Sequence, residues 1–328
     1  MKEPPPCPSN GIHLWILGAT RRLENLSDQE IFSRVYALTR NVRRPVHDSE
    51  IWDAIAKVRD TPTNELASAR PTRESEWPLV DLKRIDHIVS SGIQLSDLWD
   101  LNPYQLTETP GSKVDEIIDI IFPSNVLLCC GFDQSHFATR CRETWRGQLH
   151  RYALIVPSPM IDVVGITQKG HLSEHSRQAV GLRCYLVVEF DIQEFNDKGN
   201  ETIWAPLIRK WRECGVTIHD ASAALLWHLS SYERLTMVVH SGGKSLHGWF
   251  HALGRPEKML FDFMRLAVRY GADRAHWTNP SQFARMPEGT RDSNTPQPVY
   301  YLDPQNAVLS RTPSHGDETY QSLGQQAT

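Results

Sequence analysis

The spacing of apolar residues divides this chain of 328 residues into a helical front third and a longer region of mixed strands and helices. In the front third, apolar residues recur three or four positions apart over residues 27–38, 48–58 and 79–121, which predicts amphipathic helices. This pattern indicates a helical accessory domain over residues 1–110.

After residue 123 the pattern changes to short apolar runs bounded by proline or glycine, which is typical of strands. The order from residue 184 onward is strand, helix, strand, strand, helix, strand, which predicts a ferredoxin-like βαββαβ unit of the kind found in RNA-recognition modules. The fold class is therefore α+β. The expected elements are strands 125–131, 151–159, 184–190, 235–240, 246–252 and 299–302, and helices 203–213, 218–230 and 256–270.

This second domain is expected to span residues 111–305, and the polar residues 306–328 are expected to be a disordered tail.

The strand at 184–190 is followed by acidic residues at its C-terminal end. Alternation along a strand places Glu189 and Asp191 on one face and Leu186 and Val188 on the other. We expect the helices to cover the apolar face and to leave the acidic face open.

Two neighbouring carboxylates repel each other unless a cation lies between them, so the acidic strand end indicates a divalent metal site. A strand that simply ends in solvent would show the same residues. A second motif, SGGKSLH at 241–247, predicts a tight turn followed by a strand that carries Ser245 and His247 on one face. With Lys244, these side chains are suitable donors to triphosphate oxygens.

Asp273 follows the predicted helix 256–270 and is a candidate third carboxylate, and Arg285 in FARMPEGTR is a candidate phosphate ligand. Three carboxylates with such donors suit phosphoryl transfer that uses two metal ions. A zinc site is less well supported, because its candidate ligands have no recognised zinc spacing. Those ligands are Cys129, Cys130, His136 and Cys141.

The net charge of −4 gives no general nucleic-acid signature, yet residues 140–183 are locally basic. Within this band, Arg140, Arg142 and Arg146 flank Trp145, a combination that suits single-stranded DNA, although a solvated charged surface would look the same. No apolar run is long enough to span a membrane, and the first residues lack the features of a signal peptide, so a cytoplasmic protein without membrane partners is expected. The basic residues of the band are Arg140, Arg142, Arg146, Arg151, Lys169, Arg177 and Arg183.

Taken in order, the motifs EFD (189–191), SLH (245–247), Asp273 and FARMPEGTR resemble the archaeo-eukaryotic primase superfamily, in particular the primase-polymerase branch of mobile elements. The resemblance covers about residues 120–305. It implies a primase fold, with a catalytic half built like an RNA-recognition module, and two Mg²⁺ or Mn²⁺ ions on Glu189, Asp191 and Asp273. It also implies that Lys244, Ser245, His247 and Arg285 bind the nucleotide.

The implied activity is DNA primase or polymerase activity on a single-stranded DNA template with NTP or dNTP substrates, in association with the nucleoid and with a separate replicative helicase. Two residues depart from the family pattern: Glu189 replaces the more usual aspartate, and Glu288 delays the glycine of the later turn by one position. A catalytically decayed nucleic-acid-binding module and a metal-dependent nuclease are the alternatives.

Overall fold

The computed structural model describes residues 16, 19–20, 23, 26–39, 46–60, 77–105, 112–167, 170–291 and 295–308. The chain forms two compact units, Met1–Glu76 and Trp77–Thr328. No helix in the described part of the chain has the length and apolar character needed to cross a membrane.

The first unit contains two described helices, α2 (Asp28–Thr39) and α3 (Asp48–Asp60), as the apolar spacing predicts. Ser27 accepts a hydrogen bond from the Glu30 N–H, and the Glu30 carboxylate accepts one from the Ser27 N–H, so both groups cap the start of α2. The apolar stripes of the two helices form a small core of their own. Its buried members include Ile31, Val35, Ile51, Ala54 and Ile55.

The second unit is built around an antiparallel sheet with the strand order β12-β7-β8-β6. All four strands were predicted, two of them with the observed ends. Their bounds are β6 Tyr185–Glu189, β7 Leu235–His240, β8 Leu246–His251 and β12 Val299–Leu302.

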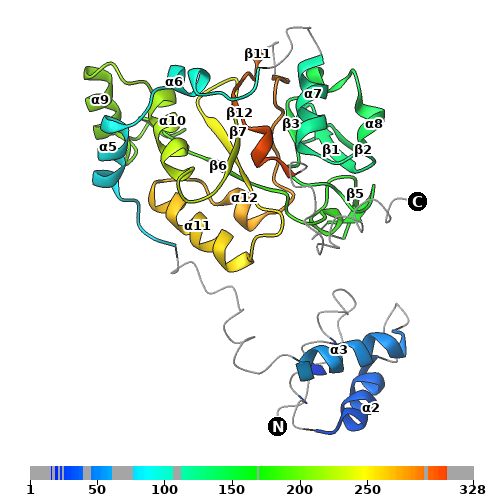
Figure 1. The fold of residues 1–328 in the computed structure, drawn as a ribbon. Helices are drawn as coiled ribbons and strands as arrows, with labels where there is room; N and C mark the ends of the chain where they lie inside the picture. The colour runs from blue at the N-terminus through cyan, green and yellow to red at the C-terminus, as the bar shows by residue number, and fades with distance from the viewer. Residues whose placement is uncertain are drawn as a thin grey trace. The chain divides into compact units, whose positions relative to one another are not determined.

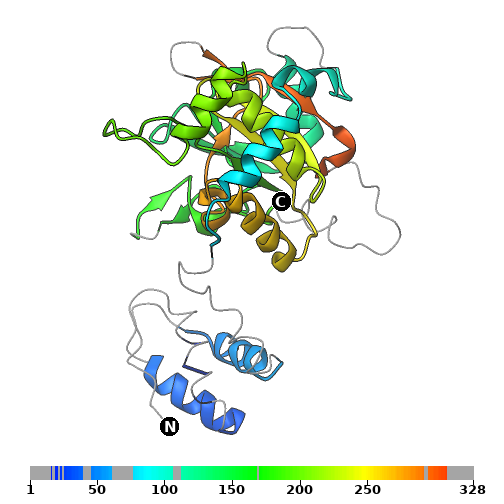
Figure 2. The ribbon, with the colours of Figure 1, turned by 90° about the vertical axis from the view of Figure 1, so that its left-hand side faces the viewer.

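Helices cover one face of this sheet. Leu186, Val188 and Phe190 of β6 and its C-terminal extension are buried in the same apolar cluster as residues of these helices, as the alternation predicted. Figure 1 shows the helices on one side of the sheet, and Figure 2 looks onto this layer. The covering helices are α5 Leu82–Ser91, α6 Leu95–Asp100, α9 Ala205–Glu213, α10 Ile218–Leu229 and α11 Glu257–Arg269.

The predicted domain boundary near residue 110 is therefore wrong. Ile85, Ile88 and Leu98 lie on α5 and α6 and are buried in the same cluster as Leu225 of α10. Because these helices bury their apolar stripes in the second unit, the boundary falls between Glu76 and Trp77.

The opposite face of the sheet is not open, contrary to the prediction. Tyr185 and Val187 are 1% and 0% exposed, because a second antiparallel sheet and helix α7 (Ser112–Ile121) pack over them. This sheet has the order β2-β1-β3-β9, and Figure 1 shows it with α7 on the side away from α5 and α9. Its strands are β1 Leu127–Gly131, β2 Phe137–Cys141, β3 Leu154–Ile155 and β9 Ala284–Arg285.

The strand order also differs from a ferredoxin-like sheet, in which β12 would lie beside β6. The first half of the pattern is present, since β8 lies between β6 and β7 and antiparallel to both. The outer edge of β6 is occupied by residues 272–277. Phe190 bridges Ala272, and the Arg183 guanidinium donates to the carbonyls of His276 and Trp277. The fourth strand pairs instead with β7.

The packed part of the second unit extends further toward the C-terminus than predicted. Val308 is fully buried, and its N–H donates to the Tyr185 hydroxyl at 3.0 Å. The predicted tail 306–328 is therefore wrong at residues 306–308, and its remainder lies outside the described residues. The other short elements are α8 Arg142–Trp145, β4 Gly165–Ile166, β5 Leu172–Ser173, α12 Ala275–Thr278, β10 Thr290–Arg291 and β11 Thr295–Pro296.

Gly271 ends α11 with a φ of +88°, and a Cβ at this position would lie 2.3 Å from the Trp204 ring. We expect Gly271→Ala to lower the free energy of unfolding by about 2–4 kcal/mol, because left-handed strain adds to overpacking against a rigid ring. Urea denaturation measures this loss. Gly254→Ala is the control, since Gly254 has a φ of +72° with nothing within 4 Å. Equal losses in the two variants would contradict the role of the ring.

Candidate functional site

The candidate site lies at the end of β6, where Glu189 faces His247 of the neighbouring strand β8. The two residues are register partners in the sheet, and His247 Nε2 lies 2.7 Å from Glu189 Oε2. The His247 and Glu189 side chains are 5% and 24% exposed, so their contact is largely removed from water. Sheet pairing thus brings the first acid of EFD and the histidine of SLH into direct contact.

This pairing determines the charge of Glu189. Burial raises the pKa of its carboxyl, but the charge and hydrogen bond of His247, together with the charges of His276 and Arg285, outweigh burial and lower the pKa to about 2. Glu189 is therefore an ionised carboxylate at neutral pH, as a metal ligand must be.

The backbone brings Asp191 and Asp273 to the same strand end. The Asp273 N–H donates to the Glu189 carbonyl at 3.0 Å, next to the bridge between Phe190 and Ala272. Both carboxylates are exposed. Asp191 Oδ2 accepts a hydrogen bond from Gln193 Nε2 at 2.9 Å, and Asp273 Oδ1 accepts one from the Ala275 N–H at 2.9 Å.

Three carboxylates at one strand end have the donor chemistry that Mg²⁺ and Mn²⁺ prefer. Each carboxylate also keeps oxygen lone pairs that its hydrogen-bond partner does not use. Their side chains do not converge, however. Within the described ranges, no three His, Cys, Asp or Glu side chains have an arrangement that could hold a metal ion. The acids thus match a divalent cation in ligand type and lie near one strand end, but their side chains would have to move before they could share an ion.

The turn between β7 and β8 is closed by its two serines. The Ser241 N–H donates to the Ser245 carbonyl at 2.9 Å, and the Ser245 N–H donates to Ser241 Oγ at 3.1 Å. Gly242 has a φ of +68°, which favours glycine. Lys244 Nζ donates to Gln193 Oε1 at 3.0 Å, so Gln193 joins this lysine to Asp191. Gln193 connects the two motifs, and no sequence motif identified it.

The arginines of the later motif approach the site from the second sheet and the β10–β11 hairpin. Arg285 of β9 is half-buried and lowers the Glu189 pKa through its charge. The Arg291 guanidinium lies against Gly243, 2.9 Å from the position of an added Cβ. The additional Glu288 has a φ of +56°, and its carboxylate accepts a hydrogen bond from the Val299 N–H at 2.7 Å. Glu288 thus shapes the turn that leads to β12.

His276 of α12 is a further buried group that the sequence reasoning missed. It is 3% exposed, and neither ring nitrogen has a hydrogen-bond partner. Burial lowers its pKa to about 3, so the ring is neutral, and its centroid lies 6.2 Å from that of His247. A histidine in a short helical turn carries no sequence signal, so only the fold reveals it.

The predicted DNA-binding arginines have unequal surroundings. Arg142 is 10% exposed, donates to the Phe122 carbonyl at 2.7 Å and pairs with Asp119. Arg146 pairs with Asp119 at 2.7 Å. Arg140 is exposed, and its guanidinium lies 4.8 Å from the centroid of the Trp145 ring.

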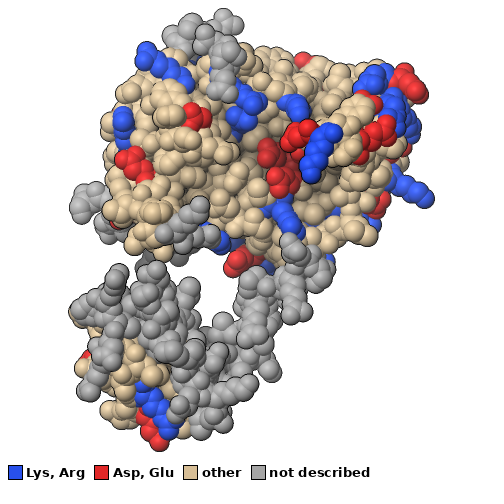
Figure 3. Space-filling model, turned by 180° about the vertical axis from the view of Figure 1, so that it is seen from behind, with Lys and Arg blue, Asp and Glu red and all other residues tan. Residues whose placement is uncertain are grey.

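Trp145 itself is fully buried and donates to the Leu128 carbonyl, so its ring is a core side chain rather than an exposed platform for bases. Arg183 is another member of the basic band, and its guanidinium donates hydrogen bonds to two backbone carbonyls. In the view from behind, Figure 3 shows acidic and basic side chains interspersed over the surface, without a field of one sign. Of the three predicted DNA-binding arginines, Arg140 and Arg146 are exposed, and Arg146 is paired with Asp119.

The alternative zinc ligands do not form a site. Cys129 and Cys130 are buried, and burial raises the pKa of the Cys129 thiol to about 11, which opposes metal binding. His136 is exposed and pairs with Asp133 at 2.8 Å. These cysteines are small core residues.

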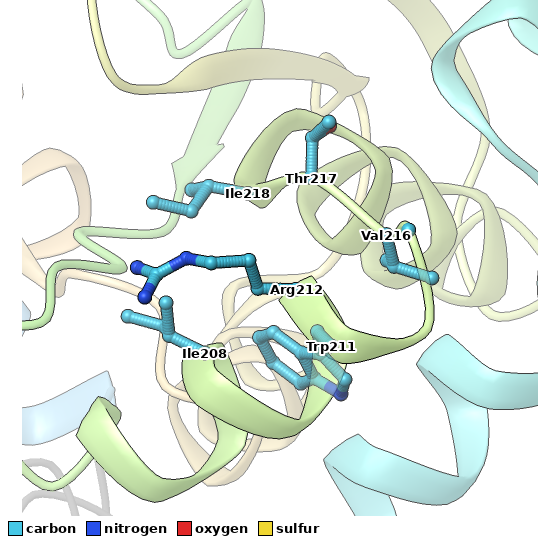
Figure 4. Close-up of a pocket in the computed structure, with 7 residues that line it drawn as sticks. Ile208, Trp211, Arg212, Val216, Thr217 and Ile218 are labelled. Carbon is cyan, nitrogen blue, oxygen red and sulfur yellow. The ribbon is translucent and has the colours of Figure 1, made fainter.

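A pocket of about 310 Å³ lies between α9 and α10, and none of the predicted site residues lines it. Figure 4 shows Ile208, Trp211 and Ile218 on its apolar wall, with Arg212 beside them. Arg212 pairs with Glu194 at 2.6 Å, which leaves the pocket without an identified charged ligand group.

Comparison of the chain with protein-family models, with curated proteins and with solved structures found no match.

Proposed function

We propose that this protein is a template-directed nucleotidyltransferase of the primase-polymerase type. The observation that carries the proposal is the junction of the two motifs at one strand end. Glu189 contacts His247 directly, and Gln193 links Asp191 to Lys244. Candidate metal ligands and candidate phosphate ligands therefore lie in one site, as the transfer of a nucleotide requires.

Glu189, Asp191 and Asp273 would hold the two Mg²⁺ or Mn²⁺ ions. When bound, such ions activate the attacking hydroxyl of the primer and stabilise the negative charge of the departing pyrophosphate. The carboxylates suit this role because Glu189 is ionised and the other two are exposed.

The turn supplies the nucleotide contacts in this proposal. Lys244 contributes a positive charge, Ser245 contributes a hydroxyl, and Arg291 lies against the same turn. His247 donates to a phosphate oxygen only when its Nε2–H is released from Glu189, since the two atoms are now 2.7 Å apart. Nucleotide binding through His247 therefore requires rearrangement of its contact with Glu189.

A nucleic-acid-binding module with a decayed site is the second candidate. It is favoured by the engagement of Glu189 with His247 and by the lack of a converging metal-ligand group in the described part of the chain. Such a module would bind single-stranded DNA and Mn²⁺ without incorporating nucleotides, and a separate replicative helicase would act with it.

A primer-free incorporation assay separates the two candidates. The full chain is incubated with single-stranded DNA, Mn²⁺ and labelled ATP or dATP, and products are resolved on a sequencing gel. We expect labelled products that depend on both template and metal. DNA binding without incorporation would instead support the decayed module, and degradation of labelled DNA without triphosphates would support a nuclease.

We expect Arg140→Ala to weaken the binding of single-stranded DNA by about three- to tenfold, because an exposed guanidinium can contact phosphate. Fluorescence anisotropy with a labelled oligonucleotide at several salt concentrations measures the loss, and the salt dependence should fall by about one phosphate contact.

Arg265→Ala is the matched control, since Arg265 of α11 is also exposed and its guanidinium also lies over an aromatic ring, 5.9 Å from the centroid of Phe261, but it is outside the basic band of residues 140–183. Arg142→Ala is expected to act on folding, lowering the free energy of unfolding by about 1–3 kcal/mol, because it removes buried hydrogen bonds. Unchanged affinity in Arg140→Ala would remove this residue from the DNA path.

A further inference from the structure

Two histidines hold the turn of residues 241–245 from the side of α10. His240 ends β7 and His219 lies in the first turn of α10, with ring centroids 4.5 Å apart. Three contacts join them to the turn. The Gly242 N–H donates to His240 Nδ1 at 3.0 Å, the two Nε2 atoms are 3.1 Å apart, and His219 Nε2 lies 3.0 Å from the Gly243 carbonyl oxygen.

These three contacts make incompatible demands on the protons of a neutral pair. Because His240 Nδ1 accepts a hydrogen bond, the proton of a neutral His240 must be on Nε2, from which it is donated to His219. His219 Nε2 is then an acceptor and faces the Gly243 oxygen, which is also an acceptor. The neutral pair therefore holds the Gly242 amide and leaves the Gly243 carbonyl without a donor from His219.

Uptake of one proton reverses the pattern. A protonated His219 donates from Nε2 to the Gly243 oxygen, and its Nε2–H can no longer face an N–H of His240. The conflict is relieved when the His240 proton lies on Nδ1, so that Nε2 becomes an acceptor. The Nδ1–H then faces the Gly242 N–H, and that amide is released.

We propose that His219 and His240 form a proton-operated switch of the 241–245 turn, in which the neutral pair holds the Gly242 amide and the protonated pair holds the Gly243 carbonyl. The consequence for nucleotides rests on the proposed function, in which this turn binds triphosphate. The released Gly242 N–H and the added positive charge both favour an anion. Acidification should therefore tighten triphosphate binding.

The surroundings of His240 favour its neutral form. Burial lowers the pKa of His240, and the charges of His219 and of His247 on β8 lower it further. Asp220 follows His219 on α10, and its carboxylate accepts hydrogen bonds from Thr217 and from the Leu95 N–H. Tyr300 of β12 lies beside His240, with ring centroids 6.2 Å apart, and the turn that the pair holds carries Lys244 and lies against Arg291 of β10.

A transition metal shared by the two Nε2 atoms is a less suitable occupant. Metal binding at His240 Nε2 would place the ring proton on Nδ1, where it opposes the Gly242 N–H 3.0 Å away. Zinc titration is therefore an informative arm of the test, because tight Zn²⁺ binding that His219→Gln abolishes would replace the proton switch by a metal site.

The test compares the full-length protein with His219→Gln. A glutamine side chain presents both an N–H donor and a carbonyl acceptor, so it can serve the Gly243 oxygen and the His240 Nε2–H together without titrating. NMR spectra that assign the histidine tautomers and the amides of Gly242 and Gly243 are recorded from pH 7.5 to pH 5.5. In the wild type, we expect both amides to shift together with a change of the His240 tautomer.

In His219→Gln this joint shift should be absent. The increase in ATP affinity on acidification should be about three- to tenfold smaller in this variant than in the wild type. His228→Gln is the control, because His228 lies nine residues along the same helix and should leave the joint shift unchanged. If the NMR signals of the Gly242 and Gly243 amides did not shift together with the change of histidine tautomer, the switch would be overturned. Normal NMR behaviour without ATP binding at any pH would instead overturn the proposed function.

Discussion

Replacing Asp191 by alanine should lower template-dependent nucleotide incorporation by about a thousandfold or more, because a two-metal reaction loses one of its three carboxylate ligands. Asp191 is the cleanest of the three acids to test. It is exposed and makes its side-chain contact with Gln193, so its loss should cost little stability, whereas Glu189 also contacts the buried His247. Single-turnover incorporation of labelled nucleotide into a primed template measures the effect.

Asp162→Ala is the matched control, since Asp162 is an exposed aspartate outside the acidic strand end. It should keep wild-type incorporation. Single-stranded DNA binding by Asp191→Ala should remain within about twofold of the wild type, which separates chemistry from template binding. Normal incorporation in Asp191→Ala at saturating Mn²⁺ would exclude this aspartate as a ligand and leave the proposed catalytic site without support.

The elements of the main sheet could be predicted because their periodicity is local. Strand β6 alternates between two buried faces, and α11 carries an apolar stripe that repeats with the helical period. The assignment of Leu186 and Val188 to the helix-covered face is correct for the same reason. The phase of this alternation also places Glu189 on the other face, beside Tyr185 and Val187.

The second sheet that packs over that other face could not be predicted, because it depends on strand pairs that are far apart in the chain. Strands β3 and β9 are two residues long, and Leu154 pairs with Arg285 across more than a hundred residues. Such short strands give little periodic signal: the predicted strand at 151–159 contains β3, but the pattern indicates neither β9 nor its pairing with β3. Trp145 shows the same limit, since a tryptophan among arginines resembles a surface residue until β1 and α7 enclose it.

The candidate site divides along similar lines. The motifs identified Glu189 and His247, and sheet register explains why they meet. The partners that set their properties have no motif: Gln193 bridges the two motifs from a loop, and His276 approaches from a four-residue helix. Their roles follow from three-dimensional proximity, which one sequence does not encode in its local pattern.

The Glu189–His247 pair should make the protein sensitive to acid in a defined interval. The pKa of Glu189 falls from an ordinary value of 4.5 to about 2, so its carboxylate binds protons less readily in the folded than in the unfolded chain. The resulting stabilisation is complete above the unfolded value and is lost as the pH falls from about 4.5 toward 2. By linkage it amounts to at most about 3 kcal/mol.

Urea denaturation of the wild type and of Glu189→Gln at pH 7, 4.5, 3 and 2.5 tests this expectation. The variant should be about 2–3 kcal/mol less stable at pH 7, and the difference should shrink steadily toward pH 2.5, because the wild-type carboxyl becomes neutral as well. Asp191→Asn is the control and should show no such convergence, since the Asp191 carboxylate is exposed and bonds a neutral amide. A difference between wild type and Glu189→Gln that stayed constant across this interval would show that the Glu189–His247 contact does not control acid stability.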